Sequence, residues 1–286
     1  MLLKNYIRRA YLSYGDIARK IAPYFWYISG DLKKSGMRYT IEEYLSLAIF
    51  VSLIVLVVEI PIITLILAFF LPVIFAILFS FLASALGATI IFFLFITYPK
   101  ALVSSLADKI NRGLPYSVSY MVAAASSDAP PIDLFKSLTK IDEYPELKEQ
   151  AANIVRDVEG MGMSLLSALR REAERTPSEE FGNLLLGIES TLASGGNLTA
   201  YLNEKAKTYF SERKAKIKTY ADLLSMLTEI YITAIIVGPI LFTLLSSIMG
   251  MMGGMGNIVG MQAIISFILM PAISLIFAFY INLTAP

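Results

Sequence analysis

The sequence predicts an all-α, polytopic membrane protein in which two pairs of transmembrane helices flank a cytoplasmic helical-bundle domain. Of the 286 residues, 56% are hydrophobic and 16% are charged, whereas soluble domains carry about a quarter charged residues. The charge is also unevenly placed, because residues 44–99 and 223–286 contain only Glu59 and Glu229 as charged side chains. Each tract exceeds the roughly 20 residues that one membrane helix needs. We therefore expect about four transmembrane helices.

Residues 1–43 are expected to form a cytoplasmic N-terminal amphipathic region. They lack the uninterrupted apolar core of a secretory signal peptide. Basic and aromatic residues alternate over residues 6–14, a pattern that suits the headgroup layer of a membrane. Packing of this region on the cytoplasmic domain is the alternative, and the pattern leaves both open.

The two apolar tracts each divide into a helical hairpin. In the first, residues 44–99, we expect spans over 44–68 and 74–98 with a turn near Phe70 to Pro72. In the second, residues 222–286, a segment rich in glycine and methionine at 250–257 separates two apolar runs. Irregular backbone is not tolerated facing lipid, so this segment is expected at the membrane surface or within protein.

The positions of lysine and arginine predict the orientation. All 24 of these residues fall within residues 1–43 and 100–221, and the two turns on the other side contain none. Basic residues stay on the cytoplasmic side of a membrane. We therefore expect a multi-pass protein of the cytoplasmic (inner) membrane with both termini and residues 100–221 in the cytoplasm. The net charge of +1 gives no reason to expect a nucleic acid partner.

Residues 100–221 show the pattern of an all-α bundle. Segments of helical length are expected at about 114–125, 132–138, 145–159, 164–174 and 178–192. In the last of these, apolar residues recur at helical spacing after a predicted N-cap at Thr176, with Pro177 in the first turn. Gly195 is the expected C-cap. A final helix begins at Leu198 and continues without a glycine or proline into the third span.

Composition excludes most catalytic chemistry. The chain has no histidine and no cysteine, so it lacks the side chains of the usual zinc sites, catalytic triads, thiol nucleophiles and iron–sulfur clusters. No glycine is followed by lysine, which excludes a Walker A phosphate loop. We expect no enzyme activity, no cofactor and no metal site.

Two groups of basic residues are candidate partner-binding sites. Arg170, Arg171 and Arg175 lie at the end of a predicted helix, where a solvated helix end is the simpler interpretation and a partner-binding patch the second. Arg213, Lys214, Lys216 and Lys218 lie just before the third span. For this basic run, anchoring to anionic headgroups and binding of an acidic partner are equally supported.

Glu59 is the candidate intramembrane acid. A carboxylate in hydrocarbon costs several kcal/mol, and Glu59 lies about 22 Å along a helix that starts at Tyr44. Snorkelling to the outer surface is favoured over an intramembrane polar contact or a proton-carrying site. Glu229 is expected near the cytoplasmic end of the third span.

Several short motifs resemble the type II secretion system F domain, which is found in membrane platform proteins of type IV pili, tight-adherence pili and the archaeal flagellum. Each motif is weak alone, and their order carries the resemblance. They are Leu32-Lys-Lys-Ser-Gly-Met-Arg38, Leu114-Pro115, Gly162-Met-Ser-Leu-Leu-Ser-Ala-Leu169, Thr176-Pro177 and Ser194-Gly-Gly-Asn-Leu-Thr-Ala-Tyr-Leu202. The sequences of these motifs are most similar to those of archaeal members.

The resemblance implies a non-enzymatic platform that couples a cytoplasmic assembly ATPase to insertion of pilin-like subunits. One F domain is present where many members have two, which implies a homodimer or a heterodimer with a paralogous platform subunit. Membrane lipid is a further expected partner. The alternative function is a secondary transporter or channel subunit, motivated by Glu59 and the broken spans.

Overall fold

All regular elements are helical in the part of the chain that the computed structural model describes, which is residues 2–37, 39–127, 129–251 and 258–284. The predicted all-α class is thus confirmed. Four of these helical stretches are long and apolar enough to cross a membrane, namely Ile41–Leu67, Val73–Ala125, Leu198–Met249 and Gln262–Ile281. The chain divides into two compact units, Met1–Ala206 and Lys207–Pro286, and each is described by itself.

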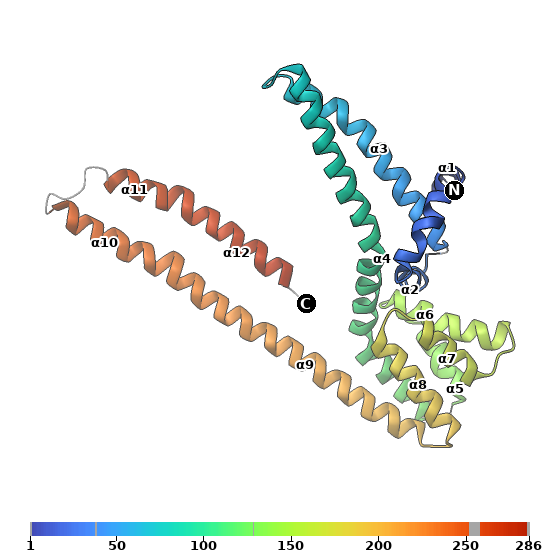
Figure 1. Ribbon diagram of the computed structural model, residues 1–286. Coiled ribbons are helices and arrows are strands. Elements are labelled where there is room, and N and C mark those ends of the chain that lie inside the picture. Colours follow the sequence, from blue (N-terminus) through green and yellow to red (C-terminus); the bar gives the residue numbers. More distant parts are fainter. Residues whose placement is uncertain (1, 38, 128, 252–257, 285–286) are drawn as a thin grey trace. The chain divides into compact units, whose positions relative to one another are not determined.

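The first unit contains a membrane hairpin made of α3 (Ile41–Leu67) and the first part of α4 (Val73–Ala125), which run antiparallel side by side (Figure 1). Thr40 begins α3 with a capping box, in which its hydroxyl accepts from the Glu43 N–H and the Glu43 carboxylate accepts from the Thr40 N–H. This cap fixes the start of the helix because it satisfies N–H groups that have no helical partner.

Helix α4 continues for 53 residues, through Pro99 and Pro115, from the hairpin into the bundle. The predicted start of a new helix at Leu114 is therefore wrong. A proline within a helix removes one backbone hydrogen bond and strains the preceding turn. Here Gly113, Leu114 and Pro115 are all buried, so packing in the bundle holds the helix together across the proline.

Four short helices form the bundle together with the second half of α4. They are α5 (Pro131–Leu138), α6 (Pro145–Val155), α7 (Leu165–Arg175) and α8 (Glu179–Ala193). The predicted helix over 145–159 ends in a π-helical turn at Arg156–Gly160. Fully buried apolar side chains fill the space between these helices: Ile110, Met121, Leu134, Phe135, Leu147, Ile154, Leu169, Phe181, Leu185 and Ile188.

The N-cap of α8 ties this helix to α4. Ser178, not Thr176, caps α8; its hydroxyl accepts from the Phe181 N–H at 3.0 Å and donates to the Asn111 side chain of α4. The prediction of Thr176 was wrong because this residue ends α7 instead. Gly195 does take the expected left-handed conformation, with φ of 69°.

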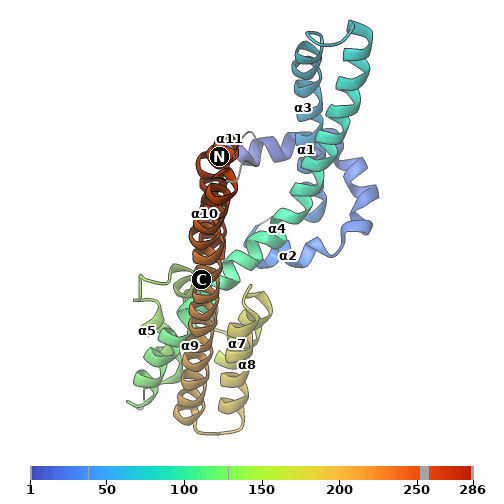
Figure 2. The ribbon, with the colours of Figure 1, turned by 90° about the vertical axis from the view of Figure 1, so that its left-hand side faces the viewer.

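An N-terminal arm surrounds the base of the hairpin. It consists of α1 (Leu2–Ile21), η1 (Ala22–Phe25) and α2 (Ile28–Lys34), and α1 crosses α3 instead of running along it (Figure 2). Tyr11 donates to the Glu42 carboxylate at 3.3 Å, and Arg19 pairs with the same carboxylate at 3.6 Å. Ile28 and Leu32 of α2 are buried against Tyr44 near the start of α3 and Ile96 in the middle of α4.

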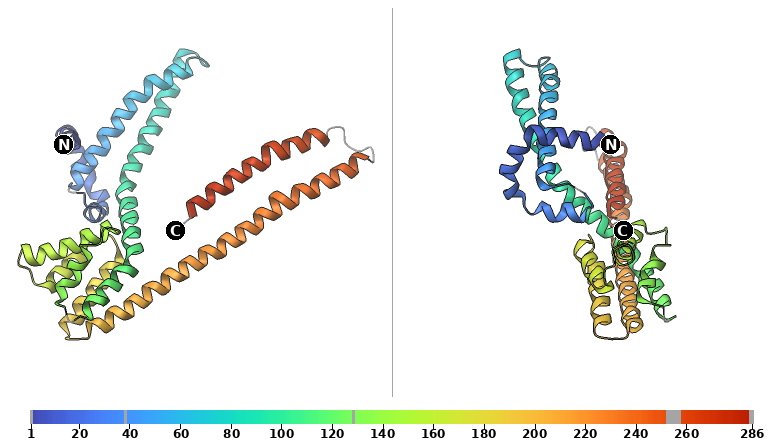
Figure 3. Two further views of the ribbon diagram at one scale, coloured as in Figure 1. Left: turned by 180° about the vertical axis from the view of Figure 1, so that it is seen from behind. Right: turned by 90° about the vertical axis from the view of Figure 1, so that its right-hand side faces the viewer.

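The second unit is a hairpin of two interrupted helices. Helix α9 (Leu198–Tyr231) passes through a π-helical turn at Ile232–Val237 into α10 (Gly238–Met251). Helix α11 (Ile258–Ile264), a second π-helical turn and α12 (Met270–Thr284) return alongside (Figure 3). The expected continuity from Leu198 to Gly238 holds, with the π turn as a local change of winding. Most of the glycine- and methionine-rich turn, residues 252–257, lies outside the described residues.

Candidate functional site

Glu59 lies inside the first hairpin, against α4. A Cβ atom placed on Gly87 would stand 2.5 Å from Glu59 Oε2 and 2.9 Å from Oε1, so the carboxylate occupies the space that a side chain would take. The Oε2 atom is buried and has no hydrogen-bond partner among the described residues. Glu59 as a whole is half-buried, and a glycine on the facing helix leaves room for its carboxylate between the helices. Snorkelling of Glu59 to the outer surface stays a prediction.

Other polar groups share this interface. Ser84 is fully buried, and its hydroxyl has no partner among the described residues. The hydroxyls of Thr64 and Ser80 are hydrogen-bonded at 2.6 Å. Together with Glu59 they form a polar seam between α3 and α4.

The sequence contains a signal for this seam that charge and hydropathy do not show. Small residues recur at every fourth position of α4, and all of them are buried: Ala76, Ser80, Ser84 and Ala88. Such a stripe lets two membrane helices approach closely. The small-residue spacing therefore predicts which face of α4 meets α3, although it does not predict that Glu59 lies there.

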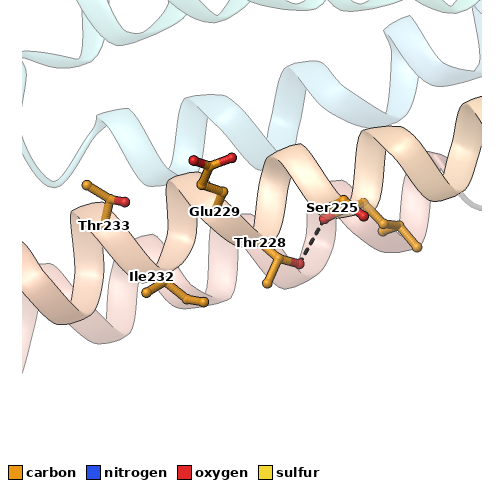
Figure 4. Close-up of a pocket in the computed structure, with 6 residues that line it drawn as sticks. Ser225, Thr228, Glu229, Ile232 and Thr233 are labelled. Carbon is orange, nitrogen blue, oxygen red and sulfur yellow. Dashed lines mark hydrogen bonds between the residues drawn. The ribbon is translucent and has the colours of Figure 1, made fainter.

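The second hairpin places its polar residues differently. A surface groove of about 490 Å³ on α9 and the following π turn (Figure 4) is lined by Leu224, Ser225, Thr228, Glu229, Ile232 and Thr233. Thr228 donates to a carbonyl of its own helix, that of Leu224, at 2.8 Å. The carboxylate of Glu229 remains exposed.

One side of the groove is turned away from the partner helix of its own hairpin. Tyr231 packs its ring against Phe277 of α12 at 5.0 Å, which marks the inner face of α9. At about 100° per residue, Glu229 and Thr233 stand almost opposite Tyr231. Ser225 stands about 120° from Tyr231, whereas Thr228 is only about 60° from it. The polar face formed by Ser225, Glu229 and Thr233, hereafter the α9 polar face, is therefore directed outward. A π-helical turn follows directly, and such turns occur frequently at functional sites.

Two of the predicted arginines meet at a buried acid. Asp157 is 1% exposed, and its Oδ2 atom lies 3.3 Å from Arg171 Nη1 and 3.9 Å from Arg175 Nη1. Arg156 approaches the other carboxylate oxygen at 3.5 Å. Since a buried charge needs compensation, these arginines hold the π turn at the end of α6 against α7.

Glu172 lies among the three arginines whose helix end the sequence predicts to be solvated, yet its side chain is buried. It is 2% exposed, and Asn153 donates to its carboxylate at 3.2 Å. Burial raises the pKa of Glu172. The sequence contained no local sign of this burial, because α6 supplies the covering surface.

Arg170 remains on the surface of the bundle. It pairs with Glu189 of α8 at 2.7 Å, beside a groove of about 320 Å³ that Leu166 and Glu174 also line. The second candidate group lies on α9, where Lys214, Lys216 and Lys218 are exposed and Arg213 is half-buried. The two groups belong to different compact units and form two separate candidate surfaces.

The acidic side chains do not gather into a metal site in the part of the chain that the structure describes. Within it, no three Asp, Glu, His or Cys side chains are grouped so that they could hold an ion. The grooves on α7 and α9 offer charged and hydroxyl side chains, which suit contacts with another protein.

Residues 118–246 match the family model of type II secretion system protein F. Over this segment the chain is similar to a type II secretion system F domain. The matched segment begins in the buried half of α4, includes the bundle and ends in α10. It contains both basic groups and the α9 polar face.

Relatives with sequence similarity occur in Methanocaldococcus jannaschii. Flagella accessory protein J is 30% identical over 140 residues, 49% of this chain and 25% of that protein. Uncharacterized protein MJ1286 is 26% identical over 139 residues, 49% of this chain and 23% of that protein. Uncharacterized protein MJ0780 is 24% identical over 211 residues, 71% of this chain and 60% of that protein.

The matched part of the chain thus spans about a quarter of the first two relatives and 60% of the third. No solved structure matches the chain significantly.

Proposed function

We propose that the chain is a non-enzymatic membrane platform of a secretion- or pilus-type assembly machine, which couples a cytoplasmic assembly ATPase to insertion of pilin-like subunits. The F domain and the similarity to flagella accessory protein J support a platform role. The four candidate membrane helices support a location in the inner membrane. The distribution of lysine and arginine supports a cytoplasmic bundle and cytoplasmic termini.

The observation that carries this proposal is the way the bundle is built on a membrane helix. Helix α4 contributes Ile110, Leu114 and Met121 to the bundle core, and the same helix begins at the far end of the hairpin. Gly113 allows Tyr144 and Leu147 to pack directly on its backbone. At 1.5 Å per residue the 53 residues of α4 extend about 80 Å. A displacement of the bundle would therefore move the membrane hairpin.

We assign the bundle surface around Arg170 and the basic run on α9 to the ATPase. Both are charged surfaces in the part of the chain that is expected in the cytoplasm, and complementary charge accelerates and orients association. We assign the α9 polar face to a membrane partner, either a pilin-like subunit or a second platform subunit. A homodimer or a heterodimer with a paralogous subunit would supply the second F domain.

The direct test uses the purified full-length protein in lipid nanodiscs and the assembly ATPase of the same cell. The platform should bind the ATPase and change its rate of ATP hydrolysis, and Arg170→Glu combined with Lys214→Glu should weaken that binding. Lys140→Glu is the matched control, because Lys140 is an exposed lysine of the bundle outside both surfaces. Stoichiometric binding of ATP by the platform alone would contradict the proposal.

A transporter or channel subunit is the second candidate. The buried carboxylate oxygen of Glu59, without a partner among the described residues, is the observation that favours it. Solute uptake into proteoliposomes that disappears in Glu59→Gln would support this function. Filament assembly that survives Glu59→Gln would count against an essential proton-carrying role.

A further inference from the structure

The N-terminal arm exposes a cluster of aromatic side chains. Tyr24, Trp26 and Tyr27 are 81%, 73% and 63% exposed, and they follow one another around η1. Large exposed aromatic groups in close sequence mark an interaction surface. The question is what covers them.

Two ring contacts fix the level of the arm along the hairpin. Phe25 packs edge-on against Phe92 of α4 at 6.1 Å, and Tyr14 lies against Phe50 of α3 at 6.2 Å. Phe92 precedes Lys100, the first charged residue after the apolar tract, by eight positions or about 12 Å. The arm therefore lies where the hydrocarbon-spanning part of the hairpin gives way to its charged end.

The chemistry of the arm matches the boundary between lipid headgroups and acyl chains. Trp and Tyr concentrate at this boundary because their rings are apolar and their tips are polar. Lys20, Lys33 and Lys34 are exposed on the same arm, and each basic residue near an anionic leaflet contributes about 1 kcal/mol of attraction. Helix α1 crosses the hairpin (Figure 2), as a helix in the plane of a membrane does.

We propose that residues 10–34 form an interfacial collar that lies in the headgroup layer of an anionic leaflet, with Tyr24, Trp26 and Tyr27 directed toward the lipid. The collar is fixed to α3 and α4 on one side and anchored in lipid on the other, so it sets the depth of the hairpin in the membrane. This inference rests on the membrane location of the hairpin and is independent of the platform role.

Trp26 makes the collar directly measurable, because it is the single tryptophan of the chain. The full-length protein would be reconstituted in phosphatidylglycerol vesicles that contain brominated phospholipid. Bromine near the headgroup end of the acyl chain should quench Trp26 more strongly than bromine near the methyl end. Acrylamide in the aqueous phase should quench it weakly.

Two variants calibrate the measurement. Trp26→Phe combined with Leu86→Trp moves the tryptophan to an exposed position in the middle of the α4 span, where bromine near the methyl end should quench best. Trp26→Phe combined with Tyr120→Trp moves it to an exposed position on the bundle, where acrylamide should quench and brominated lipid should not. Circular dichroism of each variant checks its helical content.

Two results would overturn the collar. Quenching of Trp26 like that of the Tyr120→Trp variant would place the arm in water. Protection of Trp26 from both acrylamide and brominated lipid would show that protein, such as a second copy of the chain, covers it. Replacement of Lys20, Lys33 and Lys34 by glutamine should lower quenching by brominated lipid, and unchanged quenching would contradict the role of anionic headgroups.

Discussion

The first membrane hairpin places its polar residues between its two helices, whereas the second directs them outward. In α3 and α4, the carboxylate of Glu59 lies over Gly87 and Thr64 pairs with Ser80, all between the helices. In the second hairpin, Glu229 and Thr233 face away from α12. Both hairpins have a single acid in a long apolar tract, but the first holds its acid between the helices and the second exposes its acid on the outer face.

This difference indicates which hairpin needs a partner. A polar group that faces hydrocarbon without a hydrogen bond costs several kcal/mol, so an outward carboxylate is tolerated best where another polar helix covers it. The first hairpin is also held by the arm through Glu42 and Tyr44. We infer that the first hairpin is the fixed part of the platform and the second is its docking part.

The largest expected effect comes from breaking the helical connection to the docking part. Insertion of Gly-Gly after Thr219 interrupts α9, and a flexible pair of glycines absorbs motion that an unbroken helix transmits. We expect filament assembly to be abolished while membrane insertion and protein abundance stay normal. Electron microscopy of cells and immunoblots of membranes measure both.

The control places the same insertion after Gly195, where the chain already leaves α8 in a left-handed turn. This variant should retain much more assembly. Wild-type filament numbers in the Thr219 variant, at normal abundance, would show that α9 does not transmit the motion.

A smaller effect is expected from disturbing the seam of the fixed part. Gly87→Val places side-chain atoms in the space of the Glu59 carboxylate, and overpacking of this kind costs about 1–3 kcal/mol. Gly238→Val is the matched control in the other hairpin, because the nearest atom to an added Cβ there is a carbonyl oxygen at an ordinary 3.4 Å. Denaturation in detergent micelles, followed by circular dichroism, measures the two variants.

A second substitution distinguishes a specific contact from general damage. Glu59→Ala in the Gly87→Val background removes the atoms that collide, so it should restore part of the lost stability. Equal losses for the Gly87 and Gly238 variants, or no recovery in the double variant, would refute the enclosed position of Glu59.

Much of the fold was predictable because the relevant signals are local. Two charge-poor tracts predicted four spans, and the apolar spacing from Phe181 to Ile188 predicted α8. Gly195 predicted the end of that helix. Each of these signals lies within a few residues of the feature that it specifies.

The missed features depend on residues distant in sequence. Pro115 predicted a helix start, but burial in the bundle keeps α4 continuous. The fit of Glu59 to Gly87 and of Arg171 to Asp157 depends on how helices face each other. The cap at Ser178 is reinforced by Asn111 of α4. Local patterns carry little information about such pairs, so the inward and outward polar faces became visible only in the structure.

A third prediction tests the outward face. Because the chain contains no cysteine, Ser225→Cys introduces one unique thiol on the α9 polar face, and it should cross-link to a membrane partner in cells. Leu275→Cys, at an exposed position of α12, should not.

Glu229→Leu should reduce the amount of cross-linked Ser225→Cys product several-fold, as expected for loss of about 1 kcal/mol from a membrane hydrogen bond. The stability of the isolated protein should change by less than about 0.5 kcal/mol. Equal cross-linking from both positions would mean that the polar face is not a preferred docking site.

The smallest effect concerns Glu172, a buried acid of the bundle near Arg175 and Arg156. Burial raises the pKa of Glu172, so ionisation is harder in the folded state than in the unfolded state, and the folded protein loses stability as the pH rises from the ordinary carboxyl value through the raised one. Glu172→Gln keeps an oxygen for Asn153 and removes this cost. We expect the variant to gain less than about 1 kcal/mol of folding stability at neutral pH. The gain should disappear in acid, where Glu172 of the wild type is protonated in both the folded and the unfolded state.

Amide hydrogen exchange of α7, compared between wild type and variant at each pH, measures the difference. Glu174→Gln, an exposed neighbour, is the control. A loss of protection at neutral pH would show instead that attraction to Arg175 and Arg156 outweighs burial, and that the bundle, unlike the first hairpin, stabilises the charge of the acid it encloses.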